Sequence, residues 1–477
     1  MIAADAALCS LPATQLVNHL RSGDVSAREV VAAHVERIEA ANPLVNAIVT
    51  LVADRALERA AHVDDTRVRG EPLGPLHGLP IAHKDLVATA GIRTTSGSPI
   101  FADTVPDADD LLVERARAAG AIVVGKTNTP EFGAGSQTFN PVFGATRNPY
   151  DLAKTCGGSS GGAAVALACG MVPIADGSDL GGSLRNPASF CNVVGFRPTP
   201  GRVPSWPSTN VWQDLSVEGP MGRTVEDAAL LLSALAGADR RVPISLAERG
   251  ATFAPPLDAD LGRPIVAWAP AAGGTMPLDP RIPAVVDGAR VVFESLGCRT
   301  DDAFPDLRGA RDVFLTMRAH MFAADLGELL EGHRNEIKST VVWNIEEGLR
   351  LTGTDLAEAE RMRTELGERV AAFFDRYDFL VMPVTQVVPF DVEIEFPTEI
   401  EGVAMPTYLD WMESCWCISV TGSPAISVPC GFTDDGLPVG VQIVGCRGDD
   451  LGVLRIAHAF EQATRVGDRR PQDRRLA

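Results

Sequence analysis

Two glycine-flanked serine clusters lie close together in this sequence, GGSSGG at residues 157–162 and DLGGSLRNP at 179–187. An apolar run, AAVALACGMVPIA, follows the first cluster. Glycine-rich loops before a helix commonly bind phosphate, but neither a Gly-Lys-Ser/Thr ending nor the G-x-G-x-x-G spacing is present here. The glycines therefore serve either a tight turn or the close approach of a small substrate to the backbone, and this stretch alone leaves both interpretations open.

The chain around these clusters predicts an α/β fold. Residues 70–205 consist of short apolar runs separated by glycine, proline and serine, whereas residues 1–65 predict helices. One of those helices begins with a capping box at Ser26 and is expected to end before Pro43. Further along, FLVMPVT at 379–385 predicts a buried strand, and GSPAISVPCGF with LPVGVQIVG predicts a closing pair of core strands.

Charge and composition exclude several classes of protein. The net charge of −20 argues against direct binding of nucleic acid, because a phosphate backbone would be repelled. The first residues lack the pattern of a secretory signal, and the longest apolar run is shorter than the roughly 20 residues of a membrane span. Nine cysteines favour reduced thiols in a cytoplasm, and Cys415 and Cys417 lack a second pair of zinc ligands. We therefore expect a cytoplasmic globular protein without a metal, a cofactor or a membrane partner.

A nucleophilic serine needs a base, and the histidines do not supply an obvious one. The eight histidines are scattered, and none accompanies a G-x-S-x-G elbow. A buried lysine flanked by hydroxyl groups is the other route to a base. Lys84 in LPIAHKDLV follows an apolar, strand-like run in which a charge is costly to bury. Alternatively, Lys84 is not a base but forms a structural ion pair with Asp85.

Several further stretches complete a larger pattern. They are GPLHGLPIAHKD, GKTNTPEF, FGATRNPYD, the block from GGSSGG to GFRPT, and the closing strand pair. With them the chain resembles the amidase signature family from the first helices to about residue 460. The resemblance implies one α/β/α domain over residues 1–477, built on a large mixed central sheet flanked by helices. Its signature core covers 70–205, and a variable segment at 305–415 should form much of the pocket rim.

The resemblance also implies roles for individual residues. Lys84 takes the place of the family's base, Ser159 of its bridging serine in a cis peptide bond, and Ser183 of its nucleophile. The oxyanion would be met by the backbone N–H groups of Leu180, Gly181, Gly182 and Ser183. Gly133 and Ala134 align beside the scissile group, and Ser160, Asp179 and Arg185 are expected to support the loop. His83 is expected to be structural, because its side chain would point to the opposite face of a strand.

The expected function is hydrolysis of amide C–N bonds through an acyl-enzyme on Ser183. The rim segment contains Met317, Met321, Trp343, Tyr408, Trp411, Met412 and Trp416. No charged anchor stands out among them, which favours aryl or hydrophobic amides, with carbamates as further substrates. The alternative is the glutamine-hydrolysing subunit of a tRNA-dependent amidotransferase. A catalytically inactive binding protein is a third hypothesis, against which the presence of Lys84, Ser159 and Ser183 argues. The partner is a small molecule, and the resemblance leaves a homodimer open.

Overall fold

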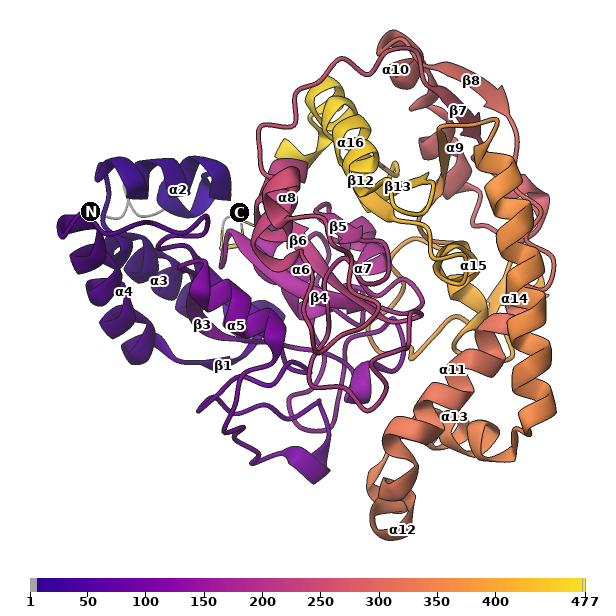
Figure 1. Ribbon diagram of the computed structural model, residues 1–477, viewed down its shortest axis with the longest axis horizontal. Helices are drawn as coiled ribbons and strands as arrows, with labels where there is room; N and C mark the ends of the chain where they lie inside the picture. The colour runs from indigo at the N-terminus through magenta and orange to yellow at the C-terminus, as the bar shows by residue number, and fades with distance from the viewer. Residues whose placement is uncertain (1–6, 474, 477) are drawn as a thin grey trace.

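The structure is a computed structural model that describes residues 7–473, 475 and 476 (Figure 1). Within these residues, eleven strands form one mixed sheet in the order β1-β3-β2-β4-β6-β5-β12-β13-β9-β7-β8. Parallel pairing joins β2 to β3 and β4, and joins β7 to β8 and β9, whereas the other neighbours are antiparallel. The predicted α/β fold with a large mixed central sheet is confirmed.

The strands of this sheet are short. They are β1 (Ile48–Leu51), β2 (Pro80–Lys84), β3 (Ile122–Thr127), β4 (Ile174–Asp179), β5 (Val194–Arg197), β6 (Val217–Gly222), β7 (Ile265–Trp268), β8 (Arg299–Asp302), β9 (Phe379–Pro383), β12 (Ala425–Phe432) and β13 (Pro438–Gly445). A separate hairpin pairs β10 (Glu399–Ile400) with β11 (Val403–Ala404). The predicted strand at 379–385 and the closing pair are thus confirmed, since they are β9, β12 and β13.

Helices flank the sheet. They are α2 (Ala13–Ser22), α3 (Ala27–Val45), α4 (Ala53–Val68), α5 (Leu111–Ala118), α6 (Gly161–Ala168), α7 (Arg185–Phe190), α8 (Val225–Leu235), α9 (Arg281–Asp287), α10 (Arg290–Ser295), α11 (Ala310–Leu326), α12 (Leu330–His333), α13 (Ser339–Arg350), α14 (Gly353–Phe374), α15 (Glu413–Ser419) and α16 (Asp450–Thr464). Figure 1 shows α2 to α5 near β1 and β3 at one end, and α11, α13 and α14 at the other. No described helix is both long and apolar enough to cross a membrane.

The N-terminal region differs from its prediction in two places. The capping box at Ser26 is present, because the Ser26 side chain accepts the Glu29 backbone N–H. The helix nevertheless continues past Pro43 to Val45, since a proline in the last turn removes only one hydrogen bond. In addition, the edge strand β1 lies between α3 and α4, where only helices were expected. Four residues are too few to produce a clear strand pattern in a sequence.

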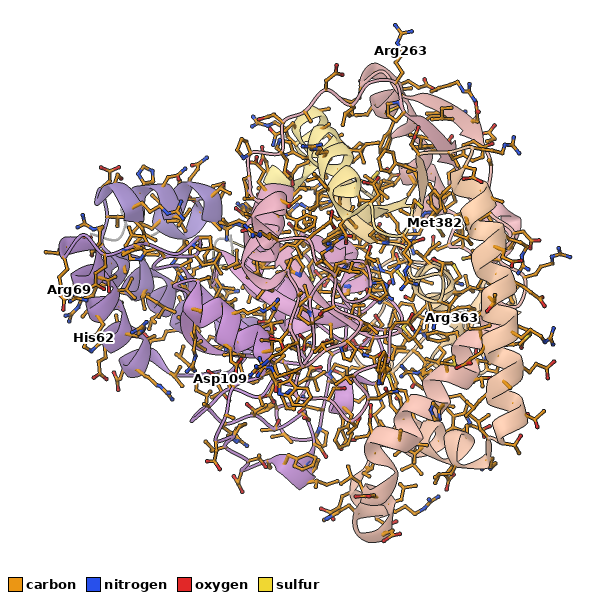
Figure 2. All side chains as sticks on the ribbon, in the orientation of Figure 1. His62, Arg69, Asp109, Arg263, Arg363 and Met382 are labelled. Carbon is orange, nitrogen blue, oxygen red and sulfur yellow. The ribbon has the colours of Figure 1, made fainter. Side chains whose placement is uncertain are left out.

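Burial explains why the middle of the sequence is so apolar. Every residue of α6 is buried, and this helix packs on β2, β3 and β4. Met382 on β9 lies within the molecule, whereas Arg263, before β7, projects from its surface (Figure 2). The apolar run after the first serine cluster is therefore the core helix that holds both serine loops against the central strands.

Candidate active site

Lys84 is the last residue of β2, and its side chain is fully buried. Its Nζ lies 2.7 Å from Ser159 Oγ, 3.0 Å from Ser160 Oγ and 3.0 Å from Ser178 Oγ. Ser159 and Ser160 precede α6, and Ser178 lies on β4, which pairs with β2. The adjacent placement of β2, β4 and the α6 loop therefore surrounds one ammonium group with three hydroxyl groups.

Burial sets the protonation of this lysine. It lowers the pKa of Lys84 to about 7, although the carboxylates of Asp176 and Asp179 act in the opposite direction. A large share of the molecules then carries a neutral amine near neutral pH. The alternative ion pair with Asp85 is wrong, because that carboxylate instead accepts the backbone N–H and the hydroxyl of Thr95.

Ser159 lies in a tightly held loop. The peptide bond between Gly158 and Ser159 is cis, as the resemblance implies. Ser136 Oγ donates to the Gly158 carbonyl at 2.5 Å, and Thr138 Oγ1 donates to the Gly157 carbonyl at 2.8 Å. These two hydrogen bonds fix the backbone that carries the Ser159 side chain toward Lys84.

Ser183 lies in the turn between β4 and α7. Its carbonyl accepts the Ser160 N–H at 3.1 Å, so the two serine loops are joined by the backbone. Ser159 and Ser183 line the same cavity, which has a volume of about 320 Å³. The structure thus places three of the sequence-predicted residues, Lys84, Ser159 and Ser183, around one site.

Asp179 and Arg185 organise this turn. Arg185 makes two hydrogen bonds to the Asp179 carboxylate, at 3.0 and 2.9 Å, and Asp179 also accepts the backbone N–H of Leu184. Burial alone would raise the pKa of Asp179, but Arg185 and Arg197 hold it well below its ordinary value. The carboxylate is therefore ionised and serves as a fixed acceptor for the loop.

The same carboxylate changes the predicted oxyanion site. The Gly182 N–H donates to Asp179 Oδ1 at 2.9 Å, so it is not free to meet a substrate, contrary to expectation. Gly182 still has to be glycine, because its φ is +113° and a Cβ would lie 2.6 Å from Cys415 Cβ. The candidate donors are then the N–H groups of Leu180, Gly181 and Ser183, three residues that line the cavity.

His83 lies outside the serine network. Its Nδ1 is hydrogen-bonded to Asp176 Oδ2. The other oxygen of that carboxylate accepts the backbone N–H of Lys84 at 3.1 Å. The side chains of His83 and Asp176 are both buried. Since neighbouring residues of a strand point to opposite faces, His83 supports β2 from the side opposite the Lys84 amine.

Both apolar and polar residues line the cavity. Apolar lining residues include Leu86, Phe132, Phe314, Met321, Phe322, Leu326, Leu409 and Met412. Besides Ser159, Ser178, Ser183, Arg318 and Asp325, the polar ones come from the segment before and within β6, namely Ser205, Ser208, Thr209, Asn210, Gln213, Ser216 and Glu218. This segment was missed, because serine, asparagine and glutamine between two strands look like an ordinary loop in a sequence.

The residues predicted for the rim lie in different places. Of the seven aromatic and methionine residues named above, Met321 and Met412 line the cavity. Trp411 and Trp416 are instead buried in the core. Gly133 also lines the cavity, whereas Ala134 is fully buried beside Phe322 and Ile337.

Three charged residues, Glu218, Arg318 and Asp325, line the cavity, although the sequence showed no anchor of that kind. Arg318 on α11 is 5% exposed, donates to Tyr408 Oη at 2.7 Å and has an Nε with no hydrogen-bond partner. Glu218 on β6 has one buried oxygen without a partner. Burial, together with Asp110 and Asp176, raises its pKa to about 8. Glu218 is therefore mostly neutral at pH 7.

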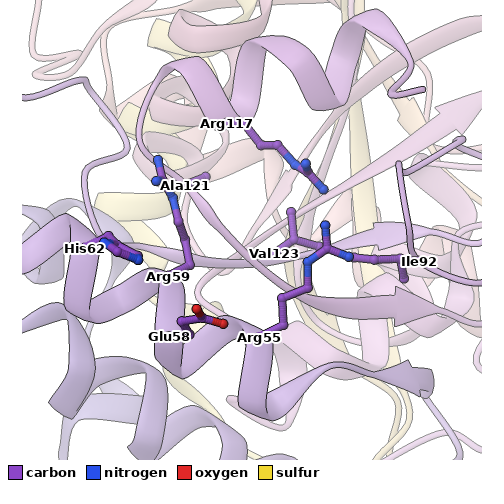
Figure 3. Close-up of a pocket in the computed structure, with 8 residues that line it drawn as sticks. All are labelled: Arg55, Glu58, Arg59, His62, Ile92, Arg117, Ala121 and Val123. Atoms are coloured by element: carbon purple, nitrogen blue, oxygen red, sulfur yellow. The ribbon is translucent and has the colours of Figure 1, made fainter. Parts of the chain in front are cut away.

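A second cavity, of about 350 Å³, shares no lining residue with the first. Figure 3 shows Arg55, Arg59 and His62 on α4 and Arg117 on α5 around it. Arg117 is paired with Asp109 at 3.2 Å, and Arg55 donates to the carbonyl of Gly91. Its charged side chains are thus partly engaged in structural contacts.

Comparison with known proteins agrees with this geometry. The profile of the family described as Amidase matches residues 29–454. An acylamidase from Rhodococcus erythropolis is 36% identical over 97% of both chains. A glutamyl-tRNA(Gln) amidotransferase subunit from Synechococcus sp. is 34% identical over 95% of this chain and 96% of its own. The crystal structure of a bacterial aryl acylamidase superposes with a TM-score of 0.88 at 31% identity, covering 96% of this chain and 98% of that one. The chain therefore belongs to the amidase signature family and is a hydrolase of amide bonds.

Proposed function

We propose that the protein cleaves aryl or hydrophobic amides through an acyl-enzyme on Ser183, with Ser159 and Lys84 as the proton relay. The observation that carries this proposal is the buried Lys84 amine, which meets Ser159 Oγ at 2.7 Å with its pKa lowered to about 7. A lysine in that state is able to act as a base near neutral pH.

The relay follows from these contacts. Neutral Lys84 accepts the proton of Ser159, which accepts the proton of Ser183, whose oxygen attacks the carbonyl carbon. Backbone N–H groups of Leu180, Gly181 and Ser183 stabilise the resulting oxyanion. The proton returns through Ser159 to the leaving amine as the C–N bond breaks. Water then attacks the acyl group on Ser183 by the same relay.

The substrate class is supported by the apolar lining. Phe132, Phe314, Met321 and Met412 offer flat or adaptable surface for an aryl or alkyl group. The aryl acylamidase with a similar structure points to the same class. Carbamates fit the same chemistry, because they also combine a carbonyl carbon with an amine leaving group.

Hydrolysis of glutamine is the second candidate, and Arg318 and Glu218 favour it. A substrate with a charged end needs a fixed partner in the cavity, since an unpaired buried charge is costly. Arg318 has a free Nε for a carboxylate, and Glu218 has a free oxygen that is able to accept a hydrogen bond from an ammonium group. In this case the chain would work within a larger assembly, like the amidotransferase relative from Synechococcus.

A substrate panel separates the two candidates. We expect kcat/KM of the purified chain to be highest for an acetanilide-type amide, lower for an aryl carbamate and lowest for free glutamine. A preference of more than about tenfold for glutamine, or ~1.4 kcal/mol at the transition state, would favour the amidotransferase function.

We also propose that residues 1–477 form one domain and that it works in the cytoplasm. Strands from residue 48 to residue 445 enter one sheet, which supports a single unit. The thiols of Cys156, Cys169, Cys191, Cys298, Cys415, Cys417, Cys430 and Cys446 are free, which suits a reducing compartment.

A further inference from the structure

Three segments that are distant in the sequence meet beside α16. His458 lies on this helix, Glu226 lies in the first turn of α8, and Asp258 lies in the connection that leads to β7. One candidate ligand atom from each residue lies within 4.8 Å of the others. His458 Nε2 is 3.6 Å from Asp258 Oδ1, too far for a hydrogen bond. Figure 1 shows α8 and α16 side by side.

The histidine is buried without a hydrogen bond. Its side chain is 7% exposed, and its Nδ1 faces Glu461 Oε2 at a distance of 3.9 Å. Neither of these two atoms has a hydrogen-bond partner, although both are buried. Glu461 itself is 9% exposed, and its other oxygen accepts the Val225 N–H. Unpaired polar atoms in such a place are costly unless a further group satisfies them.

The charge of the cluster is also uncompensated. Among the described residues, none of Glu226, Asp258 and Glu461 forms an ion pair with a lysine or an arginine. Arg223, three residues before Glu226, instead interacts electrostatically with Asp227 and donates to the backbone carbonyls of Val172 and Leu11. Burial raises the pKa of Glu461 to about 8, so this carboxyl group is mostly neutral at pH 7, and Glu226 and Asp258 are the two carboxylates that face the imidazole without a lysine or an arginine.

We propose that Glu226, Asp258 and His458 bind a divalent transition-metal ion of the Zn²⁺ type. Ligand atoms about 2.0–2.2 Å from a tetrahedral zinc ion lie roughly 3.4 Å apart, close to the observed 3.6 Å. Imidazole together with carboxylates favours zinc over Mg²⁺ or Ca²⁺. His458 Nε2 is the ring nitrogen on the side of Asp258, so its lone pair is the one that would bind the metal, while Nδ1 faces Glu461. Water completes the coordination.

The role of this site is structural. None of its residues lines the cavity that holds Ser159 and Ser183. An ion here joins α8, the connection to β7 and α16, so its binding free energy adds to the stability of the fold. The proposal is independent of the substrate, because it concerns metal content and stability and not turnover.

Titration of the metal-depleted full-length protein with Zn²⁺ tests the proposal. We expect one equivalent to bind by calorimetry, a higher melting temperature in excess Zn²⁺, and no such effect with Mg²⁺. Co²⁺ should give the visible absorption bands of a four-coordinate site without the intense near-ultraviolet bands of a thiolate ligand. Amide hydrolysis should proceed at the same rate with and without the metal.

Two variants and a matched control assign the ligands. Asp258→Asn and His458→Gln should each weaken Zn²⁺ binding at least tenfold. The Asp258 side chain is 85% exposed, so its variant should fold even if His458→Gln does not. Asp260→Asn changes a neighbouring carboxylate of the same connection and should bind like the wild type. The proposal is overturned by the absence of saturable binding, by binding that Asp258→Asn leaves unchanged, or by thiolate bands in the Co²⁺ spectrum.

Discussion

Lys84 and Lys126 are both fully buried, on the neighbouring parallel strands β2 and β3, yet their surroundings differ. Lys84 Nζ meets three hydroxyl groups. Lys126 Nζ donates to the Val87 carbonyl and to Thr89 Oγ1, with the Asp85 carboxylate nearby. A hydroxyl group is able to donate a proton back to a neutral amine, whereas a carbonyl accepts only. The Thr89 hydroxyl already donates to the Val87 carbonyl at 3.1 Å, so it too serves Lys126 as an acceptor.

The surroundings of Lys84 and Lys126 show that burial alone does not make a lysine a base. Burial lowers the pKa of both residues, to about 7 for Lys84 and about 8 for Lys126. Only the first is in contact with a serine that lines the cavity. The difference lies in the partners, which lets Lys84 exchange protons and keeps Lys126 as a structural donor.

The largest expected effect is a loss of kcat on substitution of Lys84 that substitution of Lys126 does not cause. Lys84→Met should lower kcat roughly a thousandfold or more, as should Ser159→Ala and Ser183→Ala, because each removes a member of the relay. The matched variant Lys126→Met should keep most of its turnover per folded molecule. Kinetics on protein checked by circular dichroism would measure this. Retention of a tenth of the wild-type kcat by Ser183→Ala would contradict the proposed nucleophile.

The pH profile sharpens the same comparison. Lys84 acts as a base only without its proton, so kcat/KM should rise about tenfold per pH unit below pH 7 and level off above it. A profile from pH 5 to 9 with a neutral amide substrate measures the midpoint. The midpoint should persist in His83→Gln, and its disappearance there would make the histidine the base.

Ionisation of Glu218 should change the KM of charged substrates only. Its carboxyl group is mostly neutral below pH 8 and ionised above, since its pKa is raised to about 8. The KM of an amide that bears a carboxylate should therefore rise severalfold above pH 8, because like charges repel each other in the cavity. Steady-state kinetics of wild type and Glu218→Gln would detect it. An equal rise in KM in the variant would exclude Glu218 as the cause.

The smallest effect on turnover is expected around Lys126. Thr89→Val removes one of its acceptors and should lower the free energy of unfolding by about 1–3 kcal/mol while leaving kcat nearly unchanged. Urea unfolding measures the change, with Thr354→Val on the exposed face of α14 as the control. A large loss of kcat in Thr89→Val would mean that the Lys126 region takes part in catalysis.

Local pattern was sufficient to predict much of the fold. The serine clusters, the apolar run after them and the strand ending in Lys84 are contiguous motifs, and the resemblance to the amidase signature family is what assigned Lys84, Ser159 and Ser183 their predicted roles. The apolar runs of β9, β12 and β13 are also contiguous and are long enough to indicate buried strands. The helix end at Pro43 and the short strand β1 were predicted wrongly, because neighbouring elements override weak local preferences there.

The sequence by itself determined the α/β class, the serine and lysine residues and their order. Only the tertiary structure decided that the Gly182 N–H is occupied by Asp179, that Arg318 and Glu218 line the cavity, and that His458 meets Asp258. The physical reason is that these contacts join residues from separate segments. Their geometry depends on how helices and strands pack, which composition and spacing along the chain do not encode.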